Sequence, residues 1–138
     1  VRKQLMGVAP NERLPETAYT REISTRVYQT MYDGVRMPGI VLDAQFPMVE
    51  SRAPLKHALF VHCDAPDDVV RKRMERRVHD PSRVSDATAD MLAEARARFV
   101  LPTEAENLRL LKFDTRRGTG DAVDLVTAAL LSGNAFAV

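Results

Sequence analysis

Apolar residues recur at helical spacing in the first third of the chain. Positions three or four apart predict one buried helix face, made of Ile23, Val27, Tyr28, Met31 and Val35. Thr20 is suited to cap the start of this helix, and Pro38 with Gly39 is expected to end the segment. Ahead of it, residues 1–7 (VRKQLMG) have the pattern of a helix interior that stops at Gly7, and a polar connection follows.

Three further segments have helical periodicity. A buried helix stripe is predicted by Val70, Met74 and Val78, after Pro66 at the first turn and the two acidic residues Asp67 and Asp68. Ser85 can cap the next helix, whose apolar face would carry Ala87, Met91, Ala95 and Phe99. After a turn at residues 116–121, a last amphipathic helix is predicted, with Val123, Val126, Ala129 and Leu130 on its apolar face.

Three short apolar runs predict strands instead of helices. They cover residues 40–46 (IVLDAQF), 58–66 (ALFVHCDAP) and 108–114 (LRLLKFD), and each is nearly continuous in apolar residues. Helical segments separate these runs, and such alternation predicts an α/β fold with a parallel sheet covered by helices on both faces. No internal repeat or low-complexity linker divides the chain, so we expect residues 1–138 to form a single domain.

Polar residues follow the predicted strands. Ligands of parallel α/β sheets bind beyond the carboxyl ends of the strands, and these ends carry Asp43, Cys63-Asp64 and Asp114-Thr115. A carboxylate at such an end can hold a magnesium-bound water near a phosphate, so Asp43 is a candidate catalytic and metal-site residue. The alternative is that Asp43 only ends its strand and caps the next turn.

Composition narrows the classes of function. Hydrophobic residues make up 45% of the chain and charged residues 28%, which is typical of globular proteins. The net charge of +1, from 20 basic and 19 acidic residues, argues against nucleic acid or an anionic membrane as the main partner. The one cysteine cannot form an intramolecular disulfide and suits a reducing compartment, so a cytoplasmic location is expected. No apolar run approaches the roughly 18 residues of a membrane span.

Residues 66–77 (PDDVVRKRMERR) concentrate five basic residues in one predicted helix. Arg73, Arg76 and Arg77 lie three or four apart, so they share one side of the helix and can contact a planar anionic group such as phosphate. A solvated face, balanced by the neighbouring acidic residues, is the alternative. The helix follows a strand and leads into a polar loop, as a mobile lid would; the predicted lid covers about residues 67–86.

The remaining polar residues carry weaker signals. Arg2 and Arg52 are isolated basic residues near predicted loop or helix ends, where a surface position is the simpler interpretation. The three histidines have no metal-ligand spacing, and His62 and Cys63 would point to opposite faces of a strand. The GTGD sequence at 118–121 is not a phosphate loop, because it lacks the Lys-Ser/Thr pair and follows the last strand.

Taken in order, these segments resemble the later two thirds of a P-loop kinase domain of the zeta-toxin-like and polynucleotide-kinase-like ATP-binding group. VRKQLMG resembles the segment after an aspartate on that domain's second strand, and AYTREISTRVYQTMY with VLDAQF resembles the helix and strand that follow. HCDAPDDVVRKRMERR resembles the next strand and the arginine lid helix, and SDATADML with KFDT resembles the helix and strand after the lid. The group includes the ATP-binding half of aminoglycoside phosphotransferase/ATP-binding fusion proteins.

The resemblance implies a three-layer P-loop NTPase-like sheet, truncated at its N-terminus, and an enzyme that uses ATP and Mg²⁺. The implied reaction moves the γ-phosphate to a small-molecule hydroxyl, and such catalysis is mostly positioning and charge neutralisation. In this resemblance Arg73, Arg76 and Arg77 match the lid arginines near the ATP phosphates, and Arg73 and Arg77 would also be catalytic. Asp43 matches the acidic residue near magnesium and would be catalytic as well. Thr115 and Arg116 would lie beside the adenine, and Arg2 and Arg52 would lie toward the phosphoryl acceptor.

The chain departs from the group in its phosphate-binding parts. Residues 1–138 contain no G-x-x-x-x-G-K-[ST] loop, the expected general-base aspartate would fall just before Val1, and Gln45 stands where members often carry Thr. The kinase hypothesis therefore requires an upstream segment or another chain to supply the loop. Two alternatives stay open: a kinase-like binding module without turnover, and nucleic-acid recognition through residues 71–77. Sugar, aminoglycoside and nucleotide-end acceptors are equally compatible with the sequence.

Overall fold

The computed structural model describes residues 1–35, 39–132 and 136–137. Its centre is a parallel pair of strands, β1 (Leu59–Asp64) and β2 (Arg109–Asp114), in continuous register from Leu59 opposite Arg109 to Asp64 opposite Asp114. A short strand, β3 (Phe136–Ala137), pairs in parallel with β2, which gives the order β1-β2-β3. Two of the predicted strands thus form, within a residue or two of their expected bounds.

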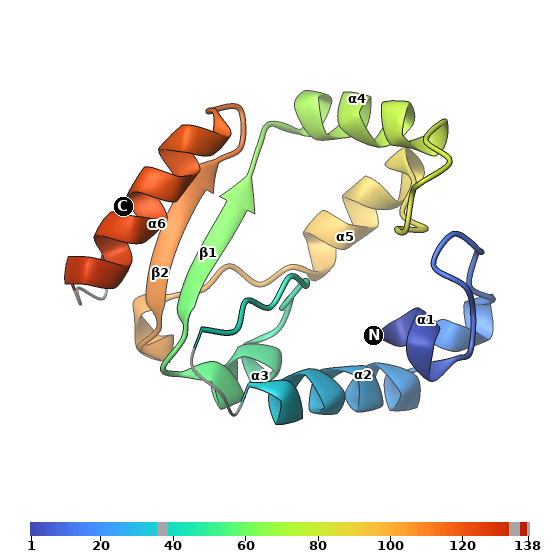
Figure 1. Ribbon diagram of the computed structural model, residues 1–138, viewed down its shortest axis with the longest axis horizontal. Coiled ribbons are helices and arrows are strands. Elements are labelled where there is room, and N and C mark those ends of the chain that lie inside the picture. Colours follow the sequence, from blue (N-terminus) through green and yellow to red (C-terminus); the bar gives the residue numbers. More distant parts are fainter. Residues whose placement is uncertain (36–38, 133–135, 138) are drawn as a thin grey trace.

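Helices make up most of the remaining regular structure (Figure 1). The α-helices are α1 (Arg2–Leu5), α2 (Arg21–Gly34), α3 (Val49–Arg52), α4 (Asp67–Val78), α5 (Leu92–Arg98) and α6 (Thr119–Ser132). The 3-10 helices are η1 (Glu16–Tyr19), η2 (Ala53–Leu55), η3 (Ala89–Met91) and η4 (Glu104–Glu106). No helix in these described ranges is long and apolar enough to cross a membrane. The chain is therefore a mixed α/β structure with a small parallel sheet.

Three of the predicted helices have an end that their sequences imply. The Thr20 side chain accepts a hydrogen bond from the Ile23 backbone N–H at 3.3 Å, so it caps α2 as expected. α4 carries acidic residues in its first turn and the arginines Arg76 and Arg77 in its last turn, a distribution that complements the helix dipole. Gly7, with φ of 67°, follows the short α1, in agreement with the predicted stop. Pro38, with which the segment was expected to end, lies outside the described residues.

The strand predicted over residues 40–46 is wrong. Residues 40–47 have no strand or helix structure, and no backbone ladder joins them to β1 among the described residues. Instead, side chains bind the carbonyl groups of this segment: the Tyr28 hydroxyl donates to the Gln45 oxygen, and Arg52 donates to the Phe46 oxygen. β-branched residues favour strands only where a neighbouring strand can pair with them, and Val41 remains 89% exposed.

The single helix predicted after Ser85 is also wrong, because the segment is divided. The Ser85 hydroxyl accepts from the Ala87 N–H in a local turn, and regular structure starts only at η3 and continues into α5. The predicted stripe on α4 is only partly buried: Val70 and Met74 are half-buried, whereas Val78 is exposed. The helix extends beyond the sheet, so its last turn has no core to contact (Figure 1).

The two main strands differ in burial. On β2, Leu110, Leu111 and Phe113 are all buried, and α6 packs against this strand (Figure 1). On β1, none of the six residues from Leu59 to Asp64 is buried, although their sequence is largely apolar. One face of the strand pair is covered by α6, and the opposite face bears Phe60 and His62, which contact Phe46 and Phe99 respectively.

Candidate functional site

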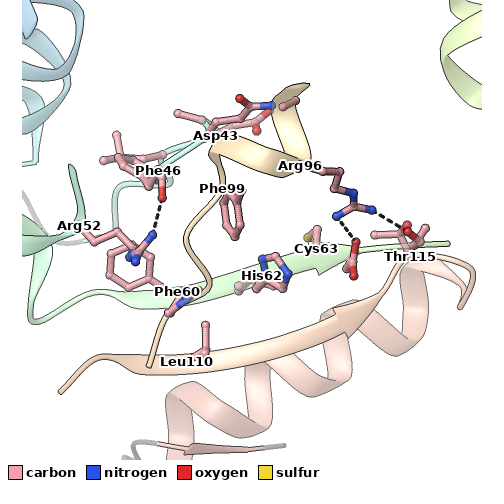
Figure 2. Close-up of a pocket in the computed structure, with 18 of the residues that line it drawn as sticks. Asp43, Phe46, Arg52, Phe60, His62, Cys63, Arg96, Phe99, Leu110 and Thr115 are labelled. Carbon is pink, nitrogen blue, oxygen red and sulfur yellow. Dashed lines mark hydrogen bonds and ion pairs between the residues drawn. The ribbon is translucent and has the colours of Figure 1, made fainter. Parts of the chain in front are cut away.

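A cleft of about 700 Å³ lies beside β1 and reaches the carboxyl ends of both strands. Its walls are β1, the irregular residues 41–46 and the cleft-facing side of α5, as Figure 2 illustrates. Aromatic residues form much of its interior: Phe46 and Phe60 meet edge to face at 6.0 Å, and Phe99 stacks on His62 at 5.3 Å. The polar groups gather at the end where the strands finish, which is the edge that the sequence predicted for a ligand site.

The parallel register brings the two strand ends together. Asp64 is the last residue of β1, and its carbonyl accepts from the Thr115 N–H at 2.8 Å, immediately after β2. Thr115 and Asp64 both line the cleft, and Asp43 lines it from the opposite wall. Three predicted site residues, Asp43, Arg52 and Thr115, therefore line the same cleft, although Asp43 is not at a strand end.

Arg96 on α5 is the polar centre of the cleft, and the sequence analysis missed it. Its Nη1 lies 2.8 Å from the Asp64 carboxylate, its Nε lies 3.1 Å from that of Asp67, and its Nη2 donates to the Ala65 carbonyl at 2.9 Å. The bond to Asp64 raises the pKa of Arg96. Burial acts to raise the pKa of Asp64, but the bonds from Arg96 and from the Ala65 backbone lower it overall. The pair is thus ionised at neutral pH.

A sequence signal for Arg96 did exist. Leu92 and Phe99 are four residues before and three residues after it, so all three share one side of the α5 segment. Leu92 is buried and Phe99 is half-buried, and both line the cleft. A basic residue on an otherwise apolar helix face indicates a charged partner inside the fold.

Arg73 on α4 contacts Thr115 directly. Its Nη1 donates to the threonine hydroxyl at 2.7 Å, and its Nη2 donates to the threonine carbonyl at 2.9 Å. Arg73 is half-buried, and the two bonds hold the middle of α4 to the chain that leaves β2. Two residues that were expected to contact a nucleotide therefore bind each other in this structure.

The other predicted nucleotide contacts lie outside the cleft lining. Arg76 and Arg77 are exposed on the last turn of α4, and their guanidinium groups make no hydrogen bond or ion pair with the described part of the chain. Arg116 is bound by Asp114: its Nε lies 2.8 Å from Oδ2 and 3.0 Å from Oδ1. The hydrogen bonds from Arg116 lower the pKa of Asp114 to about 2.

Arg52 is buried, contrary to the surface position expected for it. Only 1% of the residue is exposed, and Glu106 binds it with two oxygens, at 2.7 Å to Nε and 2.8 Å to Nη2. Its Nη1 donates to the carbonyls of Phe46, at 2.8 Å, and Val100, at 3.0 Å. Arg52 thus joins three separate segments at one end of the cleft.

Arg2 is half-buried, and its contacts are in the N-terminal part of the chain. Its Nη1 donates to the Ala18 carbonyl at 2.6 Å, and its Nη2 donates to the Ser24 hydroxyl at 3.1 Å. The guanidinium also lies 5.1 Å from the centre of the Tyr19 ring. These contacts join α1 to η1 and α2, and Arg2 does not line the cleft.

The neutral titratable groups of the cleft are His62 and Cys63. Burial lowers the pKa of His62 below its ordinary value, so the imidazole is uncharged at neutral pH. Burial, followed by the nearby Asp43 carboxylate, raises the pKa of the Cys63 thiol. The thiol therefore stays protonated, which removes the thiolate needed for nucleophilic catalysis.

The cleft contains both acidic and basic side chains, which suits a ligand that carries both charges better than a metal ion held by protein ligands alone. No cluster of three or more His, Cys, Asp or Glu residues that could hold a metal ion occurs in the described residues. The carboxylate of Asp43, which no described residue pairs, faces the ion-paired Asp64 and Arg96 across an aromatic cavity. No protein-family model, curated protein or solved structure matches this chain.

Proposed function

We propose that this chain is the C-terminal portion of a P-loop kinase-like phosphotransferase with a three-layer α/β fold. In this proposal ATP donates its γ-phosphate to a small-molecule hydroxyl, and the phosphate loop comes from a segment outside residues 1–138. One observation carries the proposal: a single cleft at the carboxyl ends of parallel strands contains Asp43, Asp64, Arg96 and Thr115, and a helix rich in arginine begins at its rim.

The proposal assigns the lid role to α4. Arg73 already reaches the end of β2, and Arg77 is one helical turn further along the same side. Arg76 and Arg77 form no side-chain hydrogen bond or close ion pair in the described residues, and Arg77 acts on the exposed Asp80 carboxylate only through its charge, so both guanidinium groups keep their donors for phosphate oxygens. Guanidinium groups bind phosphate through paired N–H donors, and this neutralises the charge that develops during phosphoryl transfer.

Asp43 could supply one carboxylate to the proposed magnesium site. Mg²⁺ in kinases is usually held by one or two carboxylates, several waters and the phosphates of the substrate. Asp43 offers one exposed carboxylate in the cleft, which is compatible with such a site and too little for a site built from protein ligands alone. When bound, the ion would neutralise phosphate charge; Asp43 itself would orient a metal-bound water.

Calorimetric titration with MgATP tests this function on the longest natural product that contains residues 1–138. Arg77→Ala should weaken MgATP binding about tenfold, the loss of one charge-assisted contact. Arg71→Ala is the matched control, because Arg71 lies on the same helix and, within the described part of the chain, its side chain makes one long hydrogen bond, to the Ala89 carbonyl at 3.4 Å. The proposal fails if MgATP does not bind, or if both substitutions weaken it equally.

A binding module without turnover is the second candidate. It is favoured by the internal neutralisation of several basic groups: Arg96 is bound by Asp64 and Asp67, and Arg116 by Asp114. Such a module would bind MgATP in the same titration but would transfer no phosphate to a hydroxyl acceptor or to water. Measuring phosphate release from ATP labelled at the γ position therefore separates the two candidates.

A further inference from the structure

α4 has little packing to fix its position. None of its residues from Asp67 to Val78, all of which the structure describes, is buried, and Val70 and Met74 are only half-buried. The helix follows the end of β1 and extends beyond the sheet (Figure 1). Burial of apolar side chains is what normally holds a helix to its fold. The direction of α4 therefore depends largely on its polar contacts.

Arg96 provides the polar contact at the beginning of α4. Its guanidinium binds the carboxylate of Asp67, the first residue of the helix, at 3.1 Å, and that of Asp64, the last residue of β1, at 2.8 Å. A third bond of 2.9 Å runs from Nη2 to the Ala65 carbonyl between them. Figure 2 shows the side chain reaching from α5 to the strand end. Arg96 thus spans the short connection, Ala65 and Pro66, that joins β1 to α4.

This contact restrains an angle as well as a distance. The donors of a guanidinium lie in one rigid plane, so acceptors before and after the connection cannot rotate relative to each other while all three bonds persist. Arg73 supplies a second restraint further along α4, through its two bonds to Thr115. The contact at the helix start and the contact at its middle together determine where the last turn, with Arg76 and Arg77, lies.

The arrangement is unfavourable for direct binding of an anionic ligand by Arg96. Its charge is already balanced by Asp64 and Asp67, and each of its three nitrogens has an acceptor. A phosphate would have to displace one of these carboxylates and would then be repelled by the carboxylate that it had displaced. The bonds of Arg96 therefore favour a role that it performs through α4.

We propose that Arg96 is a positioning residue, which binds the end of β1 and the start of α4 together and so fixes the direction in which α4 presents Arg76 and Arg77. It acts through Asp67 and contacts neither the nucleotide nor the phosphoryl acceptor. The consequence for phosphoryl transfer rests on the proposed function, whereas the restraint on α4 does not depend on it and can be measured separately.

Amide hydrogen exchange, followed by nuclear magnetic resonance on the longest natural product that contains residues 1–138, tests the restraint. In Arg96→Gln the α4 amides of residues 70–74 should exchange about fivefold faster, the change expected for loss of a partly exposed ion pair. The amides of β2 should keep their rates, which separates release of α4 from unfolding of the whole chain. Arg98→Gln is the matched control, because Arg98 lies on the same helix and binds Glu94.

A second set of variants tests whether Arg96 acts through Asp67. Asp67→Asn should accelerate the same amides, and combining it with Arg96→Gln should accelerate them no more than Arg96→Gln alone, because both changes remove one contact. Asp68→Asn is the control: it removes the same charge from the first turn of α4, but the Asp68 carboxylate lies 3.7 Å from Lys72. If Arg96→Gln does not fold, the comparison of Asp67→Asn with Asp68→Asn still decides the question.

Calorimetric titration of the two asparagine variants with MgATP tests the consequence for the proposed function. If Arg96 positions α4, Asp67→Asn should bind MgATP about threefold more weakly than Asp68→Asn, because ordering α4 then costs part of the binding free energy. If Arg96 itself bound the nucleotide, Asp67→Asn would release its guanidinium and MgATP would bind more tightly. The direction of the change therefore separates a positioning residue from a ligand-binding one.

Three outcomes overturn the proposal. The first is exchange of the α4 amides at the same rate in the unsubstituted chain, Arg96→Gln and Asp67→Asn. The second is equal acceleration of the α4 and β2 amides in Arg96→Gln, which means that Arg96 stabilises the whole fold and does not position α4. The third is tighter MgATP binding by Asp67→Asn than by Asp68→Asn. Failure of every variant to bind MgATP contradicts the proposed function alone, because the exchange rates still show whether Arg96 restrains α4.

Discussion

Arg52 and Glu106 form a two-bonded ion pair that is almost completely removed from solvent. The side chains are 1% and 8% exposed, and the guanidinium additionally binds two backbone carbonyls on separate segments. The bond to Arg52 is the main cause of the lowered pKa of Glu106. A charge pair of this kind is sensitive to the loss of one member, because the remaining charge has no water to solvate it.

Replacing Arg52 by methionine should destabilise the fold strongly. The substitution Arg52→Met keeps the apolar stem but leaves Glu106 unpaired, which costs about 3 to 5 kcal/mol for a buried pair. Urea denaturation measures the loss. Arg98→Met is the matched control, because the Arg98–Glu94 pair is 73% and 62% exposed and should contribute less than about 1 kcal/mol. A loss for Arg52→Met no larger than that of the control would contradict a structural role for the buried pair.

The pairing of Arg96 with Asp64 should be visible in the acid titration of the cleft. Arg96→Leu removes the bond and the charge of Arg96, which lower the pKa of Asp64, and leaves burial, which raises it, together with the bond from the Ala65 backbone. We therefore expect the pKa of Asp64 to rise above its value in the unsubstituted chain, measured by nuclear magnetic resonance of the carboxyl carbon. Arg98→Leu, on the same helix but directed to Glu94, should leave Asp64 unchanged. An unchanged Asp64 in Arg96→Leu would show that another group holds its charge.

The Arg73–Thr115 contact should control how firmly α4 is held. Thr115→Val removes the hydroxyl acceptor but keeps the branched shape and the backbone carbonyl that accepts the second bond. Loss of one such bond is worth about 1 kcal/mol, so exchange of the α4 amides should accelerate about fivefold. Thr115→Ser keeps the hydroxyl and serves as the control. Equal exchange rates in both variants would mean that packing alone positions α4.

Sequence patterns predicted the helices whose ends are stabilised by residues a few positions away. Thr20 caps α2 because its side chain reaches the first turn, and Asp67 begins α4 at the end of a strand; both signals lie within a few residues. The strand expected at residues 40–46 failed for the opposite reason. A strand needs a neighbour far away in the sequence, and the carbonyls of Gln45 and Phe46 accept from side chains instead.

The sequence predicted where the candidate site lies but did not predict which of its residues contact one another. The rule for parallel sheets led to Asp43 and Thr115, and both line the cleft. The spacing of Arg96 from Leu92 and Phe99 could have indicated that it faces the fold, but periodicity could not identify its partners, Asp64 and Asp67, which lie about thirty residues earlier. Arg52 was interpreted as a surface residue because it is an isolated basic residue near a predicted loop or helix end, and its partner Glu106 is 54 residues away.

The acid stability of the fold should depend on Asp86, which joins three parts of the N-terminal region. Its carboxylate accepts from the Leu14 N–H at 3.1 Å and the Tyr19 hydroxyl at 3.0 Å, and lies 3.4 Å from the Lys3 ammonium. Burial acts to raise the pKa of Asp86, but the bonds from Leu14, Tyr19 and Lys3 lower it overall. A lowered pKa in the folded state means that the ionised carboxylate stabilises folding above its ordinary pKa.

Asp86→Asn should therefore destabilise the fold at neutral pH by about 1 to 3 kcal/mol, the range for bonds to a charged group. As the pH falls through the lowered pKa of Asp86, the unsubstituted chain loses this stabilisation, and the difference between the two proteins should shrink. Urea denaturation at pH 7 and at successive values below 4 measures both effects. Asp124→Asn, an exposed change on α6, should stay within about 0.5 kcal/mol at neutral pH. A difference between Asp86→Asn and the unsubstituted chain that is independent of pH would mean that the amide disrupts packing, and that the charge of Asp86 contributes nothing.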